Sequence, residues 1–168
     1  MGDELARKRY WARSMQGWPV FSAAQPNNVH AALAEIEQHL GVIGLITQNV
    51  DRLHQAAGSQ LVIDLHGRLD QVKCLSCGAV QQRSDFQRRL EAENPAWRVL
   101  DVTIAPDGDA DLESANFAEF VIPECETCGG MLKPDVVFYG ENVPKERVFA
   151  AQTWSDDCDG VLVLGSSL

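Results

Sequence analysis

The chain has 168 residues, of which 45% are hydrophobic and 23% charged, as in an ordinary globular protein. Its net charge of −10 argues against nucleic-acid binding, because proteins that track phosphates usually carry a basic face. The sequence has no apolar run long enough to cross a bilayer, and its first residues lack the apolar segment of a signal peptide. We therefore expect neither nucleic acid nor membrane as a partner.

Two helices are predicted at the start of the chain. The first covers residues 3–14, where Leu, Ala, Arg and Lys are frequent. Gly17 and Pro19 are expected to end it, because proline removes a helical hydrogen bond. The second helix opens at Pro26, Asn27 and Asn28, with an asparagine as N-cap, and ends at Gly41. Its apolar residues recur at helical spacing, namely Val29, Leu33, Ile36 and Leu40.

Short apolar runs at residues 42–46, 61–65 and 161–164 predict strands of a buried parallel sheet. A short helix at residues 51–57, which ends at Gly58, separates the first two. A further helix should begin at Pro144 and continue through Trp154. This alternation of strands and helices is typical of the α/β class.

Polar residues follow the first and last of these strands. The segments are Gln48, Asn49, Val50 and Asp51 after the first strand and Gly165, Ser166 and Ser167 after the last, in which all but Val50 and Gly165 have polar side chains. Ligands of α/β proteins bind at the carboxyl ends of parallel strands, although plain loops end strands in the same way. His66, between a strand and a glycine, is a candidate acid or base. We expect His30, His39 and His54 to be structural or surface residues.

Four of the five cysteines form two C-x-x-C pairs, each followed by glycine. They are Cys74, Cys77, Cys125 and Cys128. In a chain without an export signal, this pattern favours structural zinc over disulfides or redox chemistry. Between the pairs we predict a helix at residues 85–93, capped by Ser84, and an acidic loop at residues 105–113.

Six segments of the chain resemble, in order, the motif series of the sirtuins, the NAD-dependent protein deacylases: TQNVDRLHQAAGS, DLHG, CLSCG, CETCGG, LKPDVVFYGE and VLVLGSSL. The N-terminal segment and the acidic insert resemble the class II branch of bacteria and mitochondria. The resemblance implies an incomplete Rossmann-like parallel sheet from residues 1–70 and 131–168. A small zinc-ribbon subdomain would occupy residues 71–130.

The resemblance also implies roles for individual residues. The residues expected to bind NAD are Gln48, Asn49, Val50, Asp51, Gly165, Ser166 and Ser167. The expected catalytic residues are His66 and Asn49, with His66 as the base that deprotonates a ribose hydroxyl after nicotinamide has left. Val136, Phe138 and Gly140 are expected to bind the acyl-lysine substrate, although Val136 and Phe138 could instead be core residues.

The implied function is NAD-dependent protein-lysine deacylation, with NAD and structural zinc as cofactors and an acylated protein or peptide as partner. The family's glycine-rich phosphate loop does not occur in this sequence, so we expect an incomplete catalytic domain. The alternatives are a non-catalytic zinc-ribbon interaction module and an ADP-ribosyltransferase that uses the same pocket. The expected compartment is the bacterial cytoplasm or the mitochondrial matrix.

Overall fold

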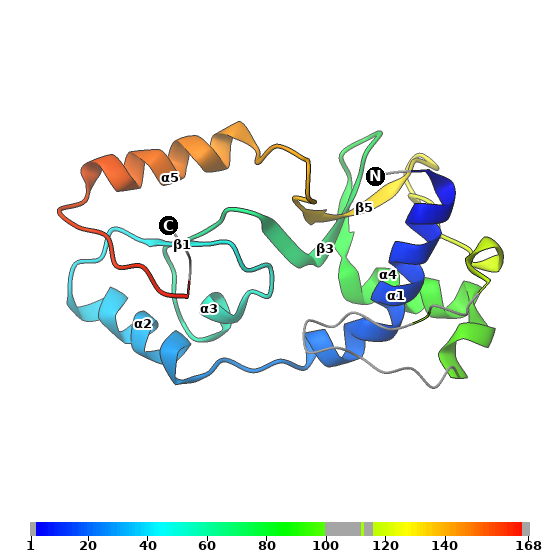
Figure 1. The fold of residues 1–168 in the computed structure, drawn as a ribbon, viewed down its shortest axis with the longest axis horizontal. Coiled ribbons are helices and arrows are strands. Elements are labelled where there is room, and N and C mark those ends of the chain that lie inside the picture. The colour runs from blue at the N-terminus through cyan, green and yellow to red at the C-terminus, as the bar shows by residue number, and fades with distance from the viewer. Residues whose placement is uncertain (1–2, 100–111, 113–115, 166–168) are drawn as a thin grey trace. The chain divides into compact units, whose positions relative to one another are not determined.

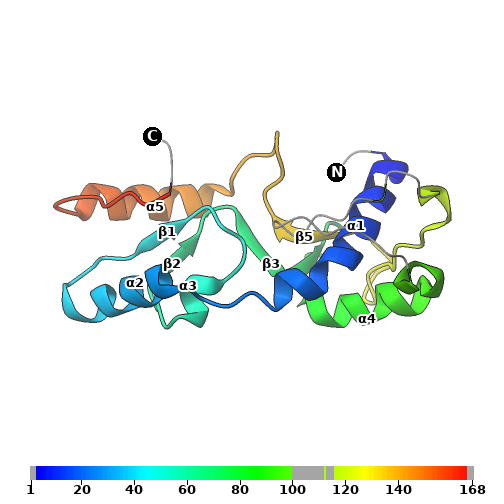
Figure 2. The same ribbon diagram turned by 60° about the horizontal axis from the view of Figure 1, so that its bottom comes forward.

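The structure is a computed structural model that describes residues 3–99, 112 and 116–165 (Figure 1). The chain divides into two compact units. The first contains Met1–Ala24 and Leu69–Asp135, and is called here the cysteine unit. The second contains Gln25–Arg68 and Val136–Leu168, and is called the parallel-sheet unit. Figure 2 shows the same elements from a second direction.

The cysteine unit is built from two helices and a three-stranded sheet in the order β4-β3-β5. Its elements are α1 (Glu4–Ser22), β3 (Gly67–Cys74), β4 (Val80–Gln82), α4 (Arg83–Glu93), η1 (Pro95–Val99), η2 (Phe117–Glu119) and β5 (Leu132–Val136). Buried and less buried residues alternate along β5, as expected for a strand with one covered face. Trp11 of α1 contacts Phe86 of α4 edge to face at 4.8 Å between ring centroids, and both are fully buried.

Helix α1 continues through Gly17 and Pro19, so the predicted end of this helix is wrong. A proline inside a helix leaves the carbonyl four residues earlier, here that of Met15, without its usual donor. The side-chain amide of Gln87 supplies the missing donor, with Nε2 at 2.9 Å from the Met15 carbonyl oxygen. Arg83 supports the same turn by donating to the carbonyl of Ser14. Side chains of α4 therefore supply hydrogen bonds that allow α1 to continue through Pro19.

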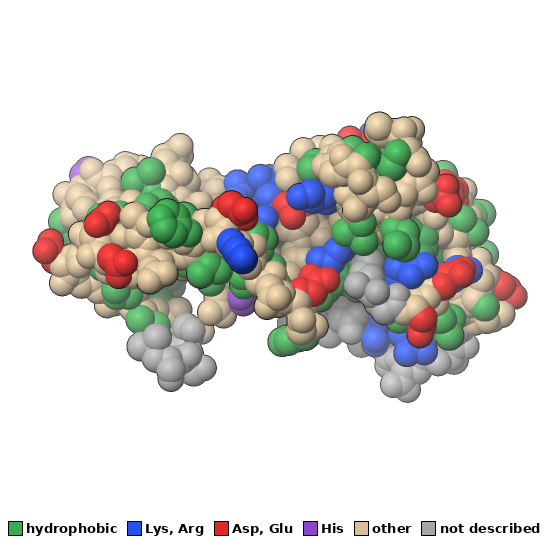
Figure 3. All heavy atoms as spheres, turned by 90° about the horizontal axis from the view of Figure 1, so that it is seen from above, with side chains coloured by type: hydrophobic (Ala, Val, Ile, Leu, Met, Phe, Trp, Pro, Cys, Tyr) green, Lys and Arg blue, Asp and Glu red, His purple; other side chains and the backbone are tan. Residues whose placement is uncertain are grey.

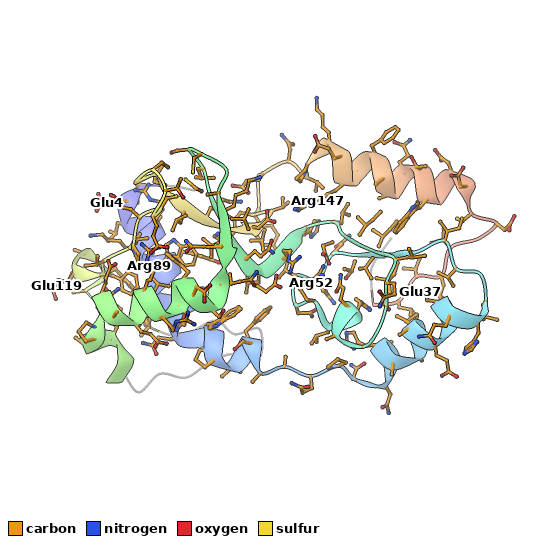
Figure 4. All side chains as sticks on the ribbon, turned by 180° about the vertical axis from the view of Figure 1, so that it is seen from behind. Glu4, Glu37, Arg52, Arg89, Glu119 and Arg147 are labelled. Carbon is orange, nitrogen blue, oxygen red and sulfur yellow. The ribbon has the colours of Figure 1, made fainter. Side chains whose placement is uncertain are left out.

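The second unit contains a two-stranded parallel sheet, which confirms the expected α/β class. Its elements are α2 (Asn28–His39), β1 (Leu45–Thr47), α3 (Leu53–Ala56), β2 (Val62–Asp64) and α5 (Lys145–Asp157). The ladder pairs Leu45 with Val62 and Thr47 with Asp64. Glu37 of α2, labelled in Figure 4, accepts hydrogen bonds from two backbone N–H groups just before β2.

Local signals at the helix ends of this unit are confirmed. Asn27 caps α2 through its side chain, which accepts from the N–H groups of Val29 and His30. Helix α5 begins directly after Pro144. Its Trp154 packs so closely on Gly44 that a Cβ there would lie 2.3 Å from the indole ring. The position before β1 therefore requires glycine.

Residues 161–164 are not a strand, which corrects the prediction from their apolar run. The side chains of Val161, Leu162, Val163 and Leu164 are 72%, 70%, 38% and 53% exposed. An apolar run becomes a buried strand only when a neighbouring strand pairs with it, and no described residue forms such a ladder here. Figure 3 shows hydrophobic side chains interspersed with acidic and basic ones on the face that it draws.

Two further boundaries differ from the sequence predictions. Helix α4 begins at Arg83 after Gln82, not at residue 85 after Ser84. The N-terminal helix α1 belongs to the cysteine unit, whereas the sequence analysis assigned residues 1–70 to the sheet domain. The acidic loop lies outside the described residues except for Leu112, which is buried. Within the described ranges, no helix is long and apolar enough to cross a membrane.

We expect Gln87→Ala to lower the free energy of unfolding by about 1–3 kcal/mol, because the buried Met15 carbonyl would lose its donor. Urea denaturation measures this loss. Gln38→Ala, at an exposed position of α2, is the matched control and should have little effect. Equal unfolding free energies for the two variants would contradict the role of Gln87.

Candidate functional site

The four paired cysteines form one cluster in the cysteine unit, with all sulfur atoms within 4.8 Å of one another. Two of the separations are 3.6 Å, from Cys74 to Cys128, and 3.8 Å, from Cys77 to Cys125. A tetrahedral zinc with Zn–S bonds of about 2.3 Å places its sulfurs about 3.8 Å apart. The cluster thus has the dimensions of a tetrahedral tetrathiolate metal site.

Glycines shape both halves of this cluster. Gly78 and Gly129 have φ of 74° and 70°, so the chain turns back after each second cysteine as the sequence predicted. Their N–H groups donate to the carbonyls of Cys74 and Cys125 at 3.1 and 2.8 Å. A Cβ at Gly130 would lie only 3.0 Å from the sulfur of Cys74. A side chain there would therefore crowd a ligand.

The thiols differ in acidity because their neighbours differ. Backbone N–H groups of Cys77 and then Ser76 lower the pKa of Cys74 to about 6, against burial, which raises it. The hydrogen bond to Cys77 raises the pKa of Cys128 to about 12. Four adjacent thiolates repel one another, so full ionisation of the cluster needs a cation among them. None of the cysteines forms a disulfide.

A second group of polar residues lies at the carboxyl ends of β1 and β2 in the parallel-sheet unit. Buried Thr47 ends β1, and its hydroxyl accepts from the N–H of Asn49 at 3.1 Å. The carboxylate of Asp51 accepts from the N–H of Leu53, the first residue of α3, at 2.9 Å. Gln48 and Asn49 are exposed between these anchors.

His66 lies in the turn that follows β2, at the same end of the sheet. Gly67, at φ 90°, makes this turn possible. The carbonyl of His66 accepts from the N–H of Val137 at 2.8 Å. This contact places the residue beside the segment that carries Val136 and Phe138. The structure therefore brings three of the predicted site segments together within one unit.

Of the remaining candidate residues, the structure describes Gly140 and Gly165. Gly140 has φ 85° and stands in an exposed turn, next to the contact between the N–H of Phe138 and the carboxylate of Glu141. Gly165 is exposed with φ 65°. Ser166 and Ser167 lie outside the described residues.

Two side-chain pairs in this unit carry no signal in the sequence. The guanidinium of Arg52 pairs with the carboxylate of Asp64. The rings of His30 and His54 lie 4.7 Å apart between centroids, which agrees with the structural role expected for both. Neither pair has a spacing that a sequence pattern could have revealed.

Residues 2–168 match the Sir2 family. The chain is 58% identical over 168 residues to an NAD-dependent protein deacetylase of Xanthomonas campestris, covering all of this chain and 57% of that protein. It is 56% identical to NAD-dependent protein deacetylase 2 of Bradyrhizobium diazoefficiens, again over the whole chain and 62% of that protein. The chain thus spans about three fifths of the length of these relatives.

Solved structures give the same result. A sirtuin structure described as "The Structural basis for Sirtuin Substrate affinity" matches 90% of this chain and 53% of its own, with a TM-score of 0.68 and 29% identity. A Sir2 structure with p53 peptide and NAD⁺ matches 82% of this chain and 46% of its own, with a TM-score of 0.60 and 31% identity. The fold is that of a sirtuin-type α/β protein. The chain belongs to the Sir2 family.

We expect acid to destabilise the parallel-sheet unit through His54. Burial lowers the pKa of His54 below its ordinary 6.5, and nearby His30 lowers it further, while Asp51 and Asp64 oppose the shift. The unfolded chain then binds the proton more readily than the folded chain. The contribution of His54 to stability is therefore full above about pH 6.5 and is lost as the pH falls through the lower, folded pKa.

Melting temperatures at about pH 7.5 and about pH 5.5 measure this loss. In His54→Gln the difference between the two values should shrink, while exposed His39→Gln on α2 should retain it. The same acid-induced decrease in His54→Gln as in the unmodified chain would contradict the assignment.

Proposed function

We propose that this chain forms part of the catalytic domain of an NAD-dependent protein-lysine deacylase. One observation carries the proposal: the register that pairs Thr47 with Asp64 puts the segments of Asn49 and His66 at adjacent carboxyl ends of parallel strands. Nucleotides bind at such strand ends in α/β proteins. The 58% identity to an NAD-dependent protein deacetylase supports the same reaction.

NAD would supply a ribose carbon, which the acyl-lysine oxygen would attack while nicotinamide leaves. Gln48 and Asn49 would hold the nicotinamide ribose, since their exposed side chains follow directly on β1. Asp51 would keep the backbone around Val50 in place through its hydrogen bond with the N–H of Leu53. His66 would accept the proton of a ribose hydroxyl, a task suited to histidine near neutral pH.

The phosphates and the adenosine ribose would be bound by the second polar segment, Gly165, Ser166 and Ser167. The positive φ of Gly165 supports this assignment, because glycine lets a backbone turn closely past a ligand. The product would be an acylated ADP-ribose together with free lysine.

The acylated peptide would bind along the segment after β5, by adding a strand to the backbone there. Val136 is buried at the end of β5, while Phe138 and Gly140 lie beyond it with greater exposure. Sir2 structures bound to an acetylated and to a propionylated peptide support this class of partner.

The metal proposed for the cysteine cluster is one structural zinc. Thiolate ligands suit zinc, and a site closed by four of them leaves no position for a substrate. Cys74, Cys77, Cys125 and Cys128 would each supply one ligand. Cysteines that act as thiolate ligands suit a reducing compartment, here the bacterial cytoplasm, or the mitochondrial matrix in a eukaryote.

We expect one zinc per chain, measured by elemental analysis of the purified protein. A chelator should remove the zinc and lower the melting temperature, because metal binding is coupled to folding. Cys125→Ser should lose the metal, whereas Cys158→Ser, outside the cluster, should retain it. Absence of stoichiometric zinc in the unmodified protein would contradict this proposal.

The catalytic proposal is tested in this chain joined to the remaining segments of the Xanthomonas relative, called here the completed protein. We expect His66→Ala to reduce deacylation by about 10²–10⁴-fold, the usual cost of losing a general base. Nicotinamide exchange, which precedes the proton transfer, should be less affected. Zinc content should not change.

His39→Ala is the control, and His54→Ala tests the nearest rival base. Near-normal deacylation in His66→Ala together with its loss in His54→Ala would assign the base to His54. The mass of the product separates deacylation from transfer of ADP-ribose to protein.

A further inference from the structure

Arg52 has an unusual backbone conformation at the edge of the candidate site. Its φ and ψ are 65° and 17°, and no other non-glycine residue in the described ranges has a positive φ. A side chain in this left-handed region crowds the neighbouring carbonyl, so glycine is the usual choice. Such a conformation persists only where the surroundings enforce it, and it recurs at functional sites. The contacts of Arg52 should therefore show what enforces it.

The side chain of Arg52 is anchored on one carboxylate. Its Nη1 donates to Oδ2 of Asp64, at the end of β2. Gln55 of α3 donates to the other oxygen, Oδ1, at 2.9 Å. The side chains of Arg52 and Asp64 are only 26% and 15% exposed, so water screens their ion pair less than it screens a surface pair.

These contacts join the two ends of the segment of residues 48–51, called here the 48–51 loop. Asp64 is the ladder partner of Thr47, the residue from which the loop leaves β1. Arg52, labelled in Figure 4, follows the loop. Its guanidinium donates back to Asp64. Both ends of the loop are thus fixed to the same position of β2. That position lies two residues before His66.

We propose that Arg52 is a positioning residue that holds the 48–51 loop, through Asp64, in the conformation that binds the nicotinamide ribose. The inference rests on the proposed function, which places Gln48 and Asn49 at that ribose. Arg52 itself touches the reaction only through the loop. Its contribution is to limit the orientations that the two amide side chains can adopt.

Arg52→Gly is the decisive variant, because glycine accepts φ 65° without strain while removing the guanidinium. Arg52→Lys keeps the charge but loses the planar guanidinium that donates to Asp64, so it should rescue part of the effect. Arg88→Ala is the control. It removes an exposed arginine–aspartate pair of 2.7 Å, with Asp85 on α4, far from the loop in sequence.

Hydrogen exchange of the chain itself provides the first measurement. We expect the amides of the 48–51 loop to exchange about fivefold to tenfold faster in Arg52→Gly, since one partly shielded ion pair is lost. In Arg52→Gly, the exchange rates of amides in α2 and in the cysteine unit should not change. In Arg88→Ala, the exchange rates of the loop amides should not change. Unchanged exchange in the loop would overturn the inference, whether or not the protein is an enzyme.

Steady-state kinetics of the completed protein provide the second measurement. We expect kcat/KM for NAD to fall about tenfold to hundredfold in Arg52→Gly, and less in Arg52→Lys, because misplaced binding groups are costly. Melting temperature and zinc content should stay unchanged. A fall in activity that is accompanied by an equivalent loss of thermal stability would overturn the inference. Unaltered kinetics in a variant whose loop amides exchange faster would overturn it as well.

Failure of the proposed function is recognised separately. It would show as absence of NAD-dependent deacylation in the unmodified completed protein, before any variant is compared. In that case the positioning of a ribose is overturned, while the exchange data still report whether Arg52 holds the loop.

Discussion

The candidate site depends on the register of one short parallel ladder. A shift of one residue between β1 and β2 would turn every side chain to the opposite face of the sheet. In the observed register Thr47 faces Asp64, and the N–H of Leu65 donates to the carbonyl of Thr47 at 2.9 Å. The exposed amides after β1 and the His66 turn after β2 thereby meet at one end of the sheet. Glu37 supports this register by holding the backbone just before β2.

The packing of α1 against α4 in the cysteine unit depends on one buried cation. The guanidinium of Arg83 is 1% exposed, contacts the ring of Trp18 at 4.8 Å and bonds to Gln87 at 2.7 Å. Burial lowers the pKa of Arg83 to about 10, so it stays charged at neutral pH. Aromatic faces and hydrogen bonds compensate for its lost hydration. The same two α4 residues, Arg83 and Gln87, donate to the carbonyls of Ser14 and Met15 and so support α1 next to Pro19.

Much of the site was predictable because its chemistry is local. The four-cysteine cluster followed from two C-x-x-C-G segments, since a cysteine spacing of three and a glycine at positive φ suffice for each half. The cap at Asn27 and the start of α5 after Pro144 were predictable for the same reason. The strand predicted at residues 161–164 failed because an apolar run does not reveal whether another strand will pair with it.

The sequence by itself determined the family, the four-cysteine cluster and most helix starts, because each is encoded within a few neighbouring residues. Only the tertiary structure decided that α1 passes Pro19, since the donor for the Met15 carbonyl comes from 72 residues away. It alone also revealed the pair of Arg52 with Asp64, across 12 residues. Such partners meet only after the chain has folded, because their approach is set by helix packing and strand register and leaves no periodic trace in the sequence.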